Sequence, residues 1–402
     1  MSTNPPVLLA YSGGLDTSFC IPWLAEQLNC DVITITVDTG GIDDEAALSL
    51  EARSKALGAV EHHRVDAKDV FFDEVIRYLI AGNIKRGQRY PLCVGAERGL
   101  QAAMMAKVAN ERGASRIAHG CTAAGNDQVR FEVALRALAP NCEILAPVRD
   151  NSWQREDQLA FLAERDLPTP PTGADYSINR GLWGITIGGQ ETLTSQQGLP
   201  ESAWVLSSGA IESGKSPESH TLTFEKGIPV ALDGNTASPV ALIEQLETLG
   251  ATFGIGRGIH LGDTILGTKG RVAFEAPAAE ILIETHRELE KLTLSGLQLR
   301  VKDQVAATYG DFVHEGKQLD PACRDIEALL ESSQAQVSGT VTFTLSPGRL
   351  FIEGTESAQS LLAATKGVYG EAAGEWTAAD ARGYSRVLAL PGILQSRARN
   401  AS

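Results

Sequence analysis

Near the start of the chain, small and polar residues gather in the string Tyr-Ser-Gly-Gly-Leu-Asp-Thr-Ser, residues 11–18. Ser12, Gly13 and Gly14 permit a sharp turn whose backbone N–H groups can face an anion. An apolar run precedes the string and a helical pattern follows it, so the positive end of a helix dipole would lie at the turn. This order predicts a phosphate-binding loop. The alternative is a β-turn that only joins two elements.

A second group of polar residues lies between His119 and Glu132. Asn126 and Arg130 are four residues apart and would share one helix face. A carboxylate is bound by amide or guanidinium donors and an ammonium by Asp127, so the cluster suits a zwitterionic amino acid. The alternative is structural, with Asp127 as the N-cap of the next helix and Arg130 in a surface ion pair.

Alternating strands and helices would position both groups. Because the carboxyl ends of parallel strands meet at one edge of a sheet, the turns at Ser12, Asp38 and Gly120 would converge there. The first half is therefore predicted to be α/β, a doubly wound parallel sheet. We expect strands at 7–10, 31–37, 60–65, 115–119 and 143–146, and helices at 19–27, 42–57, 70–79, 96–112 and 128–139.

The pattern changes after Pro168–Gly173, a rigid polar break that suits a domain boundary. The second half is predicted to be α+β. The expected elements are a hairpin of 221–225 and 228–232, helices at 239–249, 278–292, 297–309 and 321–334, and a hairpin of 339–345 and 349–353. The glycine-rich stretch 254–270 is expected to be irregular. The predicted domains are 1–167, 168–355 and a C-terminal arm, 356–402, whose tail from Ala389 could instead be a frayed terminus.

Composition narrows the function classes. A formal charge of −15 argues against a broad nucleic-acid surface. The start of the chain has neither a basic region nor a long apolar segment, so no secretion or membrane insertion is expected. Six scattered cysteines without a C-x-x-C pair indicate reduced thiols and a cytoplasmic protein. His260 and His286 lack partners at ligand spacing, so no metal site made by protein side chains alone is predicted.

The motifs also carry a family resemblance. The string S-G-G-x-D-S/T resembles the loop of the N-type ATP pyrophosphatases. With G-x-T-x-x-G-N-D-Q-V-R-F-E downstream, and Arg89-Tyr90-Pro-Leu followed by Ala96-Glu-Arg98, the chain resembles the argininosuccinate synthases from residue 7 to about 190, and more weakly beyond. The resemblance implies a ligase that joins citrulline and aspartate through a citrullyl-adenylate, with ATP and Mg²⁺, in a cytoplasmic homotetramer.

The same resemblance assigns roles to individual residues. Asp16, Asn126 and Asp127 would be catalytic, with Asp16 and Thr17 near the polyphosphate or its Mg²⁺ and Ser18 adding a hydroxyl. The matched ATP contacts are Ala10, Tyr11, Ser12, Gly13, Gly14, Leu15, Asp16, Thr17, Ser18, Val37 and Gly120. The matched substrate contacts are Thr122, Asn126 and Asp127 for aspartate, and Tyr90, Arg98, Asn126, Arg130, Ser177 and Thr186 around citrulline.

The chain departs from the family pattern at four places: the turn Asp38–Gly41, and Gly95, Gly262 and Phe274, which stand for a Ser, a Glu and a Tyr. A lost buried polar contact costs about 1–3 kcal/mol, so either other groups such as Arg98 refill this end of the pocket or the substrate differs there. An N-acylated citrulline is thus one alternative. A tRNA-modifying enzyme would need a basic face and usually a Cys pair, and a non-enzymatic ATP-binding protein would not need the Asn126–Arg130 cluster.

Overall fold

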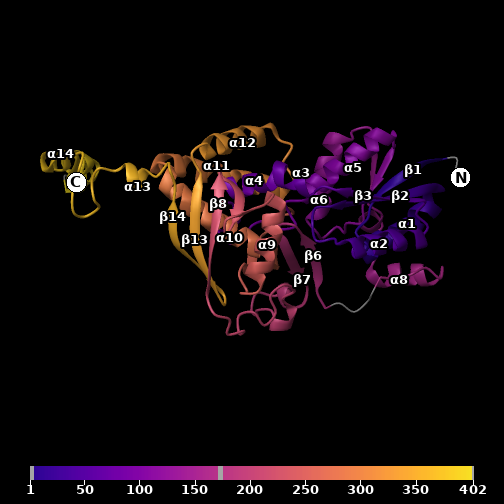
Figure 1. Ribbon diagram of the computed structural model, residues 1–402. Coiled ribbons are helices and arrows are strands. Elements are labelled where there is room, and N and C mark those ends of the chain that lie inside the picture. The colour runs from indigo at the N-terminus through magenta and orange to yellow at the C-terminus, as the bar shows by residue number, and fades with distance from the viewer. Residues whose placement is uncertain (1–3, 171–174, 401–402) are drawn as a thin grey trace.

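The first half of the protein is built on a parallel sheet. The computed structural model describes residues 4–170 and 175–400. Five strands pair in the order β3-β2-β1-β4-β5, all parallel, which confirms the predicted sheet (Figure 1). Strand order reverses between β1 and β4, the place where such sheets bind ligands. The strands are β1 (Asn4–Ala10), β2 (Cys30–Asp38), β3 (Glu61–Asp66), β4 (Arg116–Ala118) and β5 (Glu143–Leu145).

Helices cover both faces of this sheet because its central strands are apolar on both sides. Along β1, Val7 and Leu9 pack into one core cluster with α1, while Leu8 packs into another with α5. This alternation fixes which helix lies on which face. The helices are α1 (Leu15–Leu28), α2 (Asp44–Ala56), α5 (Arg98–Arg112), α6 (Asp127–Leu138), α7 (Pro147–Asp150) and α8 (Arg155–Ala163).

The second half contains two antiparallel sheets, in agreement with the predicted α+β class. One has the order β10-β9-β8-β13-β14 and the other β11-β12-β7-β6. The strands are β6 (Ser177–Gly181), β7 (Gly184–Gly188), β8 (Glu218–Glu225), β9 (Ile228–Leu232), β10 (Asn235–Thr236), β11 (Arg257–Asp263), β12 (Lys269–Glu275), β13 (Gly339–Ser346) and β14 (Arg349–Glu356). The helices are η2 (Gln190–Leu193), η3 (Glu201–Ala203), α9 (Pro239–Ala251), α10 (Pro277–Thr293), α11 (Gly296–Glu315) and α12 (Pro321–Gln334).

The expectation of an irregular stretch at 254–270 is wrong. Most of it forms the antiparallel pair of β11 and β12. Glycine disfavours strands in isolation, but here pairing along seven positions supplies the backbone hydrogen bonds, and Gly258 leaves room for the ring of Phe274 on the neighbouring strand. Tertiary pairing therefore overrides local preference.

One segment of the first half crosses to the second. It comprises α3 (Lys68–Phe71), the π-helical turn η1 (Phe72–Ile76) and α4 (Arg77–Ala81), where one helix was predicted. The helix α4 packs against α10 and α12, and the largest core cluster runs through both halves without a break. The domain limits at 167 and 355 stay a prediction. Of the predicted break Pro168–Gly173, residues 171–173 lie outside the described residues.

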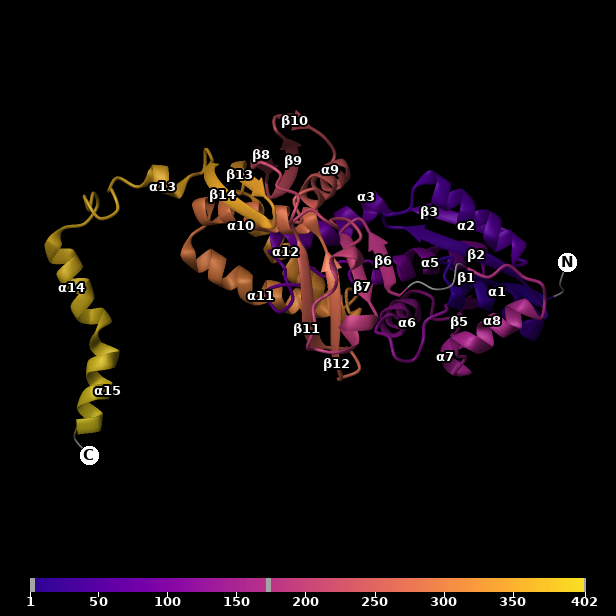
Figure 2. The same ribbon diagram turned by 90° about the horizontal axis from the view of Figure 1, so that it is seen from below.

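The end of the chain leaves the body. After β14 come α13 (Leu361–Ala364), α14 (Ala378–Leu388) and α15 (Leu390–Asn400), and α14 and α15 stand well away from the three sheets (Figure 2). Every side chain from 361 to 400 is exposed or only half-buried, including Trp376, Tyr384 and Leu388. The described part of the tail is thus helical. Residues 401–402 lie outside it.

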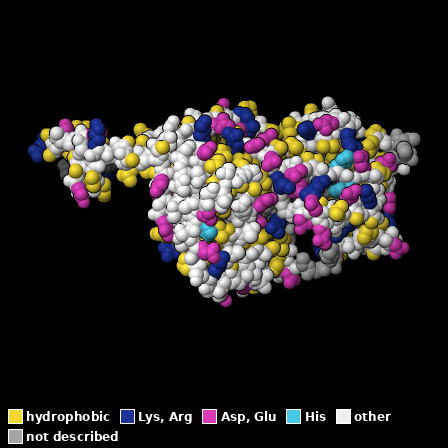
Figure 3. Space-filling model, viewed as in Figure 1, with side chains coloured by type: hydrophobic (Ala, Val, Ile, Leu, Met, Phe, Trp, Pro, Cys, Tyr) yellow, Lys and Arg dark blue, Asp and Glu magenta, His cyan; other side chains and the backbone are white. Residues whose placement is uncertain are grey.

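On the face shown in Figure 3, acidic and basic side chains are interspersed over the body. Across the residues that the structure describes, no helix is long and apolar enough to cross a membrane.

Candidate active site

The predicted phosphate loop lies between β1 and α1. Gly13 has a φ of +74°, a left-handed conformation that favours glycine, and a Cβ there would collide with Leu50. The Ser12 backbone N–H donates to Thr17 Oγ1 at 3.4 Å, and the Thr17 hydroxyl donates to the carbonyl of Gly14 at 3.3 Å. The loop is therefore folded back onto the first turn of α1, whose free N–H groups form an anion-binding terminus.

The loop after β4 lies against this turn. A Cβ on Gly120 would be 2.9 Å from Thr17 Cγ2 and 3.1 Å from the Thr17 backbone nitrogen. Only a residue without a side chain allows this approach. Ala10, the last residue of β1, is half-buried, and Val37, next to the last residue of the adjacent strand β2, is buried.

Asp16 is half-buried in the first turn of α1. Gln158 on α8 is 2% exposed and donates to Asp16 Oδ1 at 2.9 Å, while Oδ2 has no hydrogen-bonding partner among the described residues. Gln158 thus orients the carboxylate, and Oδ2 is left available to bind a ligand. Ser18 is fully buried, with its hydroxyl beside that of the buried Tyr11. Leu15 is half-buried.

The second predicted cluster lies at the start of α6. Asn126 is the N-cap residue and Asp127 the first helical residue, so Asp127 is not the cap that the structural alternative required. Asn126 Oδ1 accepts from the backbone N–H of Ile265 at 2.9 Å, which ties the turn between β11 and β12 to this helix. Arg130 is 6% exposed, so it is not in a surface ion pair either. Thr122 is exposed on the loop between Gly120 and Asn126.

Two guanidinium groups hold Asp127. Arg98 Nε donates to its Oδ2 at 3.0 Å and Arg130 Nη1 to its Oδ1 at 2.8 Å. Burial would raise the pKa of Asp127, but these two cations outweigh it and lower the pKa. The carboxylate is still 37% exposed, so a ligand can reach it in its ionised form.

Arg130 is itself fixed from α11. Its Nε donates to the carbonyl of His314 at 2.7 Å, and its Nη2 lies 3.1 Å from His314 Nδ1. Burial first, then the charge of Arg130, lowers the pKa of His314 to about 3. His314 is therefore neutral at physiological pH and can accept from the guanidinium.

Aromatic side chains form the wall opposite this cluster. Tyr90 is 7% exposed, its hydroxyl donates to the carbonyl of Cys93, and its ring is 5.2 Å from that of Phe274 and stacked on His260 at 5.5 Å. Thr186 is paired with Phe274 across β7 and β12. Because directly opposite residues share a sheet face, Thr186 lies on the same face as Phe274.

The edge strand of this sheet carries the remaining predicted residue. Ser177 is exposed on β6, two positions before Asn179, so the two share a face. Asn179 is paired with Thr186, and Arg98 Nη2 donates to Asn179 Oδ1 at 3.3 Å. Arg98 thus joins α5, α6 and β6, bringing the predicted substrate residues of both halves together.

Local groups occupy the space at the positions where the chain departs from the family pattern. A Cβ on Gly95 would lie 3.3 Å from Arg130 Nη2, and one on Gly262 would lie 2.5 Å from His260 Nε2 and 3.2 Å from Arg86 Nη1. Arg98 points elsewhere, to Asp127 and Asn179. The turn after β2 is held by its own carboxylate, since Asp38 accepts from Gly40 and Arg64.

Several residues of the site were not predicted from the sequence to lie there. His260, His314, Gln158 and Asn179 belong to no recognised string and reach the site only through tertiary contacts. Glu97 lies within the Ala96-Glu-Arg98 stretch, and its place directly before Arg98 was the available signal. Around these residues and elsewhere in the described chain, no three His, Cys, Asp or Glu side chains gather as metal ligands.

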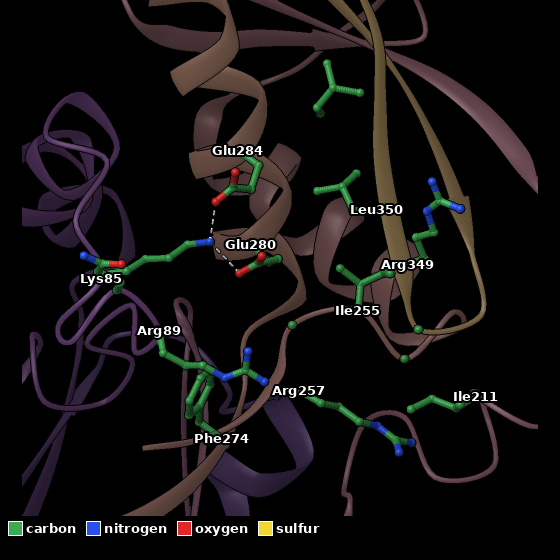
Figure 4. A pocket seen from close by; sticks show the side chains of 15 residues that line it. Lys85, Arg89, Ile211, Ile255, Arg257, Phe274, Glu280, Glu284, Arg349 and Leu350 are labelled. Atoms are coloured by element: carbon green, nitrogen blue, oxygen red, sulfur yellow. Dashed lines mark hydrogen bonds and ion pairs between the residues drawn. The ribbon is translucent and has the colours of Figure 1, made fainter. Parts of the chain in front are cut away.

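A separate cavity of about 600 Å³ lies behind the aromatic wall (Figure 4). Phe274 lines it together with Arg89, Arg257 and the turn of β13 and β14. Lys85 reaches Glu280 and Glu284 on α10 across one side, at 2.7 and 2.6 Å. Since Phe274 also contacts Tyr90, its ring separates this cavity from the Tyr90 side of the site.

Comparison with known proteins covers nearly the whole chain. The family model "Arginosuccinate synthase N-terminal HUP domain" matches residues 6–168, and "Arginosuccinate synthase C-terminal domain" matches residues 176–394. The argininosuccinate synthase of Methanocaldococcus jannaschii is 36% identical over 355 residues, 88% of this chain and 89% of the relative. Those of Dehalococcoides mccartyi strain CBDB1 and Dictyoglomus turgidum are each 38% identical over 88% of this chain, and over 87% and 88% of their own lengths.

Proposed function

The chain belongs to the argininosuccinate synthase family, and we propose that it joins citrulline to aspartate with ATP, releasing argininosuccinate, AMP and pyrophosphate. Family membership makes it a carbon–nitrogen ligase that uses ATP. The observation that supports the proposal most is the convergence of the loop at 11–18, the Asn126–Arg130 cluster and Tyr90 at one edge of the parallel sheet.

In the proposed reaction, the ureido oxygen of citrulline attacks the α-phosphorus of ATP and pyrophosphate leaves. The amine of aspartate then displaces AMP from the citrullyl-adenylate. The N–H group of Gly13 and those at the start of α1 would stabilise the charge on the leaving pyrophosphate, since the N–H groups of Ser12 and Gly14 donate within the loop. With no covalent enzyme nucleophile, catalysis would rest on holding three substrates in line.

Asp16 is suited to Mg²⁺ that arrives with ATP. Such ions are commonly held by one or two carboxylates together with substrate phosphates, and Asp16 offers a free oxygen beside the loop. Bound there, the ion would neutralise part of the polyphosphate charge. Thr17 would be the neighbouring hydroxyl.

The two amino acids would bind on the other side of the crevice. Thr122, Asn126 and Asp127 would bind aspartate, with the ionised Asp127 accepting from its ammonium group. Tyr90, Arg98, Asn126, Arg130, Ser177 and Thr186 would surround citrulline. Because His260 already fills the space beside Gly262, unmodified citrulline fits this wall better than an N-acylated one.

We also propose that the protein is a cytoplasmic homotetramer whose C-terminal arm binds a neighbouring subunit. Helices α14 and α15 expose Tyr384, Val387, Leu388 and Leu394, and an isolated pair of helices cannot bury these side chains. A second copy would cover them. Removal of residues 361–402 should reduce the assembly size in light scattering; an unchanged size would contradict this role.

One assay tests the function. Pyrophosphate and AMP release are measured with ATP and Mg²⁺, omitting citrulline or aspartate in turn, and with N-acetylcitrulline and N-succinylcitrulline as replacements. We expect AMP release to require both amino acids, with the highest kcat/KM for citrulline. Preference for an acylated substrate would revise the substrate alone, whereas no amino-acid-dependent AMP release would overturn the ligase.

A further inference from the structure

Glu97 is a carboxylate buried at the centre of the site, although none of the roles above uses it. It is 1% exposed and precedes α5 as its N-cap residue. The Thr39 hydroxyl donates to its Oε2 at 2.5 Å, and its Oε1 is 3.5 Å from Arg98 Nη1. The carboxylate abuts Gly181 on β6 so closely that any side chain at that position would overlap it.

These contacts join two parts of the site. On the nucleotide side, Thr39 belongs to the turn after β2, and its carbonyl accepts from the N–H of Leu182 at 3.0 Å. On the amino-acid side, Arg98 binds Asp127 and Asn179. Gln101 closes the ring, because its Nε2 donates to Thr39 Oγ1 at 3.0 Å and its Oε1 accepts from Arg98 at 2.8 Å.

The charge of Glu97 is sensitive to pH in the physiological range. Burial raises its pKa to about 7, against the opposing effects of Arg98 and the Thr39 hydroxyl. Asp127 and Asp38 also face it and favour the protonated form, and the thiol of Cys93 lies close by. Asp38 is in turn paired with Arg64. Arg98 therefore has two anionic partners at high pH and one at low pH.

We propose that Glu97 is a positioning residue for the ligation. In its ionised form it holds Arg98, and through Arg98 also Asp127, in a fixed position relative to the turn after β2. The inference rests on the proposed function, since it assigns Asp127 to aspartate. One carboxylate then sets the geometry between the nucleotide and the attacking amine. Its loss should weaken aspartate use more than ATP or citrulline use.

Glu97→Gln provides the test, because it keeps the size and an acceptor for Thr39 but removes the charge. Pyrophosphate release is measured from pH 6 to 9, with KM determined for each substrate. We expect the KM for aspartate to rise about five- to tenfold at pH 8, with kcat within twofold. Wild-type kcat/KM for aspartate should fall below pH 7, and the ratio of wild type to variant should approach one there.

Glu247→Gln is the matched control. Glu247 is a second carboxylate whose pKa burial raises, and it accepts from Arg180, the neighbour of Gly181, at 3.0 Å on the side away from Arg98. The Glu247→Gln variant should leave the KM for each substrate and the pH profile unchanged. Thr39→Val removes the donated bond and keeps the charge, so it should raise the KM for aspartate less than Glu97→Gln does.

The outcomes separate the two proposals. A Glu97→Gln enzyme with wild-type KM and pH profile would overturn the positioning role and leave the ligase intact. An equal loss for all three substrates without a change in pH profile would also overturn it, as a purely structural effect. A wild-type protein without aspartate-dependent pyrophosphate release would overturn the proposed function, and the role of Glu97 with it.

Discussion

The proposed nucleotide side and the proposed amino-acid side of the site are built in different ways. The nucleotide side consists of turns at the ends of β1, β2 and β4, each encoded by one short string, with Gly13 and Gly120 providing conformations and contacts that other residues cannot. The amino-acid side is made of side chains from α5, α6, α11 and the sheet of β6, β7, β11 and β12. Arg130 and its partner His314, for example, are 184 residues apart in sequence.

This difference has a physical consequence. Backbone N–H groups bind phosphate without regard to the side chains around them, so the nucleotide side depends on loop shape. The amino-acid side depends on charge pairs such as Asp127 with Arg98 and Arg130, so each group there affects its neighbours. The effects of substitutions should therefore be independent of one another on the nucleotide side and coupled to one another on the amino-acid side.

Asp16→Asn should produce the largest effect and tests the nucleotide side. Removing the charge that is assigned to the polyphosphate and its Mg²⁺ should lower kcat by about 10²–10³-fold. Asn keeps an acceptor for Gln158, so the thermal midpoint should change little. Steady-state pyrophosphate release and thermal unfolding check both claims. A wild-type rate would remove Asp16 from the phosphate site.

Glu97 joins the two sides and should affect stability. Its pKa is about 7 in the folded protein against 4.5 normally, so the unfolded chain loses its proton first as the pH rises. The stability of the wild type relative to Glu97→Gln should thus be greatest below pH 4.5 and fall by roughly 3 kcal/mol as the pH passes 7.

Urea unfolding at pH 5 and pH 8 measures this difference. From pH 5 to pH 8, the free energy of unfolding of Glu97→Gln should rise relative to that of the wild type. Glu225→Gln, at an exposed position on β8, should show no such rise. A gain that is equal in the two variants would place the effect in the overall charge of the protein.

The two sides also differ in how far the sequence predicted them. The parallel sheet and the loop at 11–18 follow from local patterns, because strand, turn and helix are adjacent in the chain. The pairing of β11 with β12, the hairpin of β6 and β7, and the places of His260, His314 and Glu97 depend on burial and long-range pairing, which no short window contains.

Asp127→Asn tests the amino-acid side. The charge-assisted bond to the aspartate ammonium should be worth about 1.5–3 kcal/mol, so the KM for aspartate should rise roughly ten- to hundredfold. The KM for citrulline should rise far less. Substrate-saturation kinetics for both amino acids decide the matter. Equal effects would mean that Asp127 serves only to hold Arg98 and Arg130.

The smallest effect is expected at the wall of the citrulline side, with Gly262→Ala. The new Cβ would lie 2.5 Å from His260 Nε2, so the ring must move from its stacked position on Tyr90. A displaced flexible side chain costs little, about 1 kcal/mol, which corresponds to a roughly fivefold rise in the KM for citrulline. The KM values for ATP and aspartate should not change, because the Tyr90 wall faces neither substrate. Gly354→Ala on β14 is the control, since a Cβ there meets no atom within 4 Å. If the KM for aspartate rises together with that for citrulline, the stacked rings of Tyr90 and His260 are coupled to the Asp127 cluster. The coupling within the amino-acid side would then include its aromatic residues.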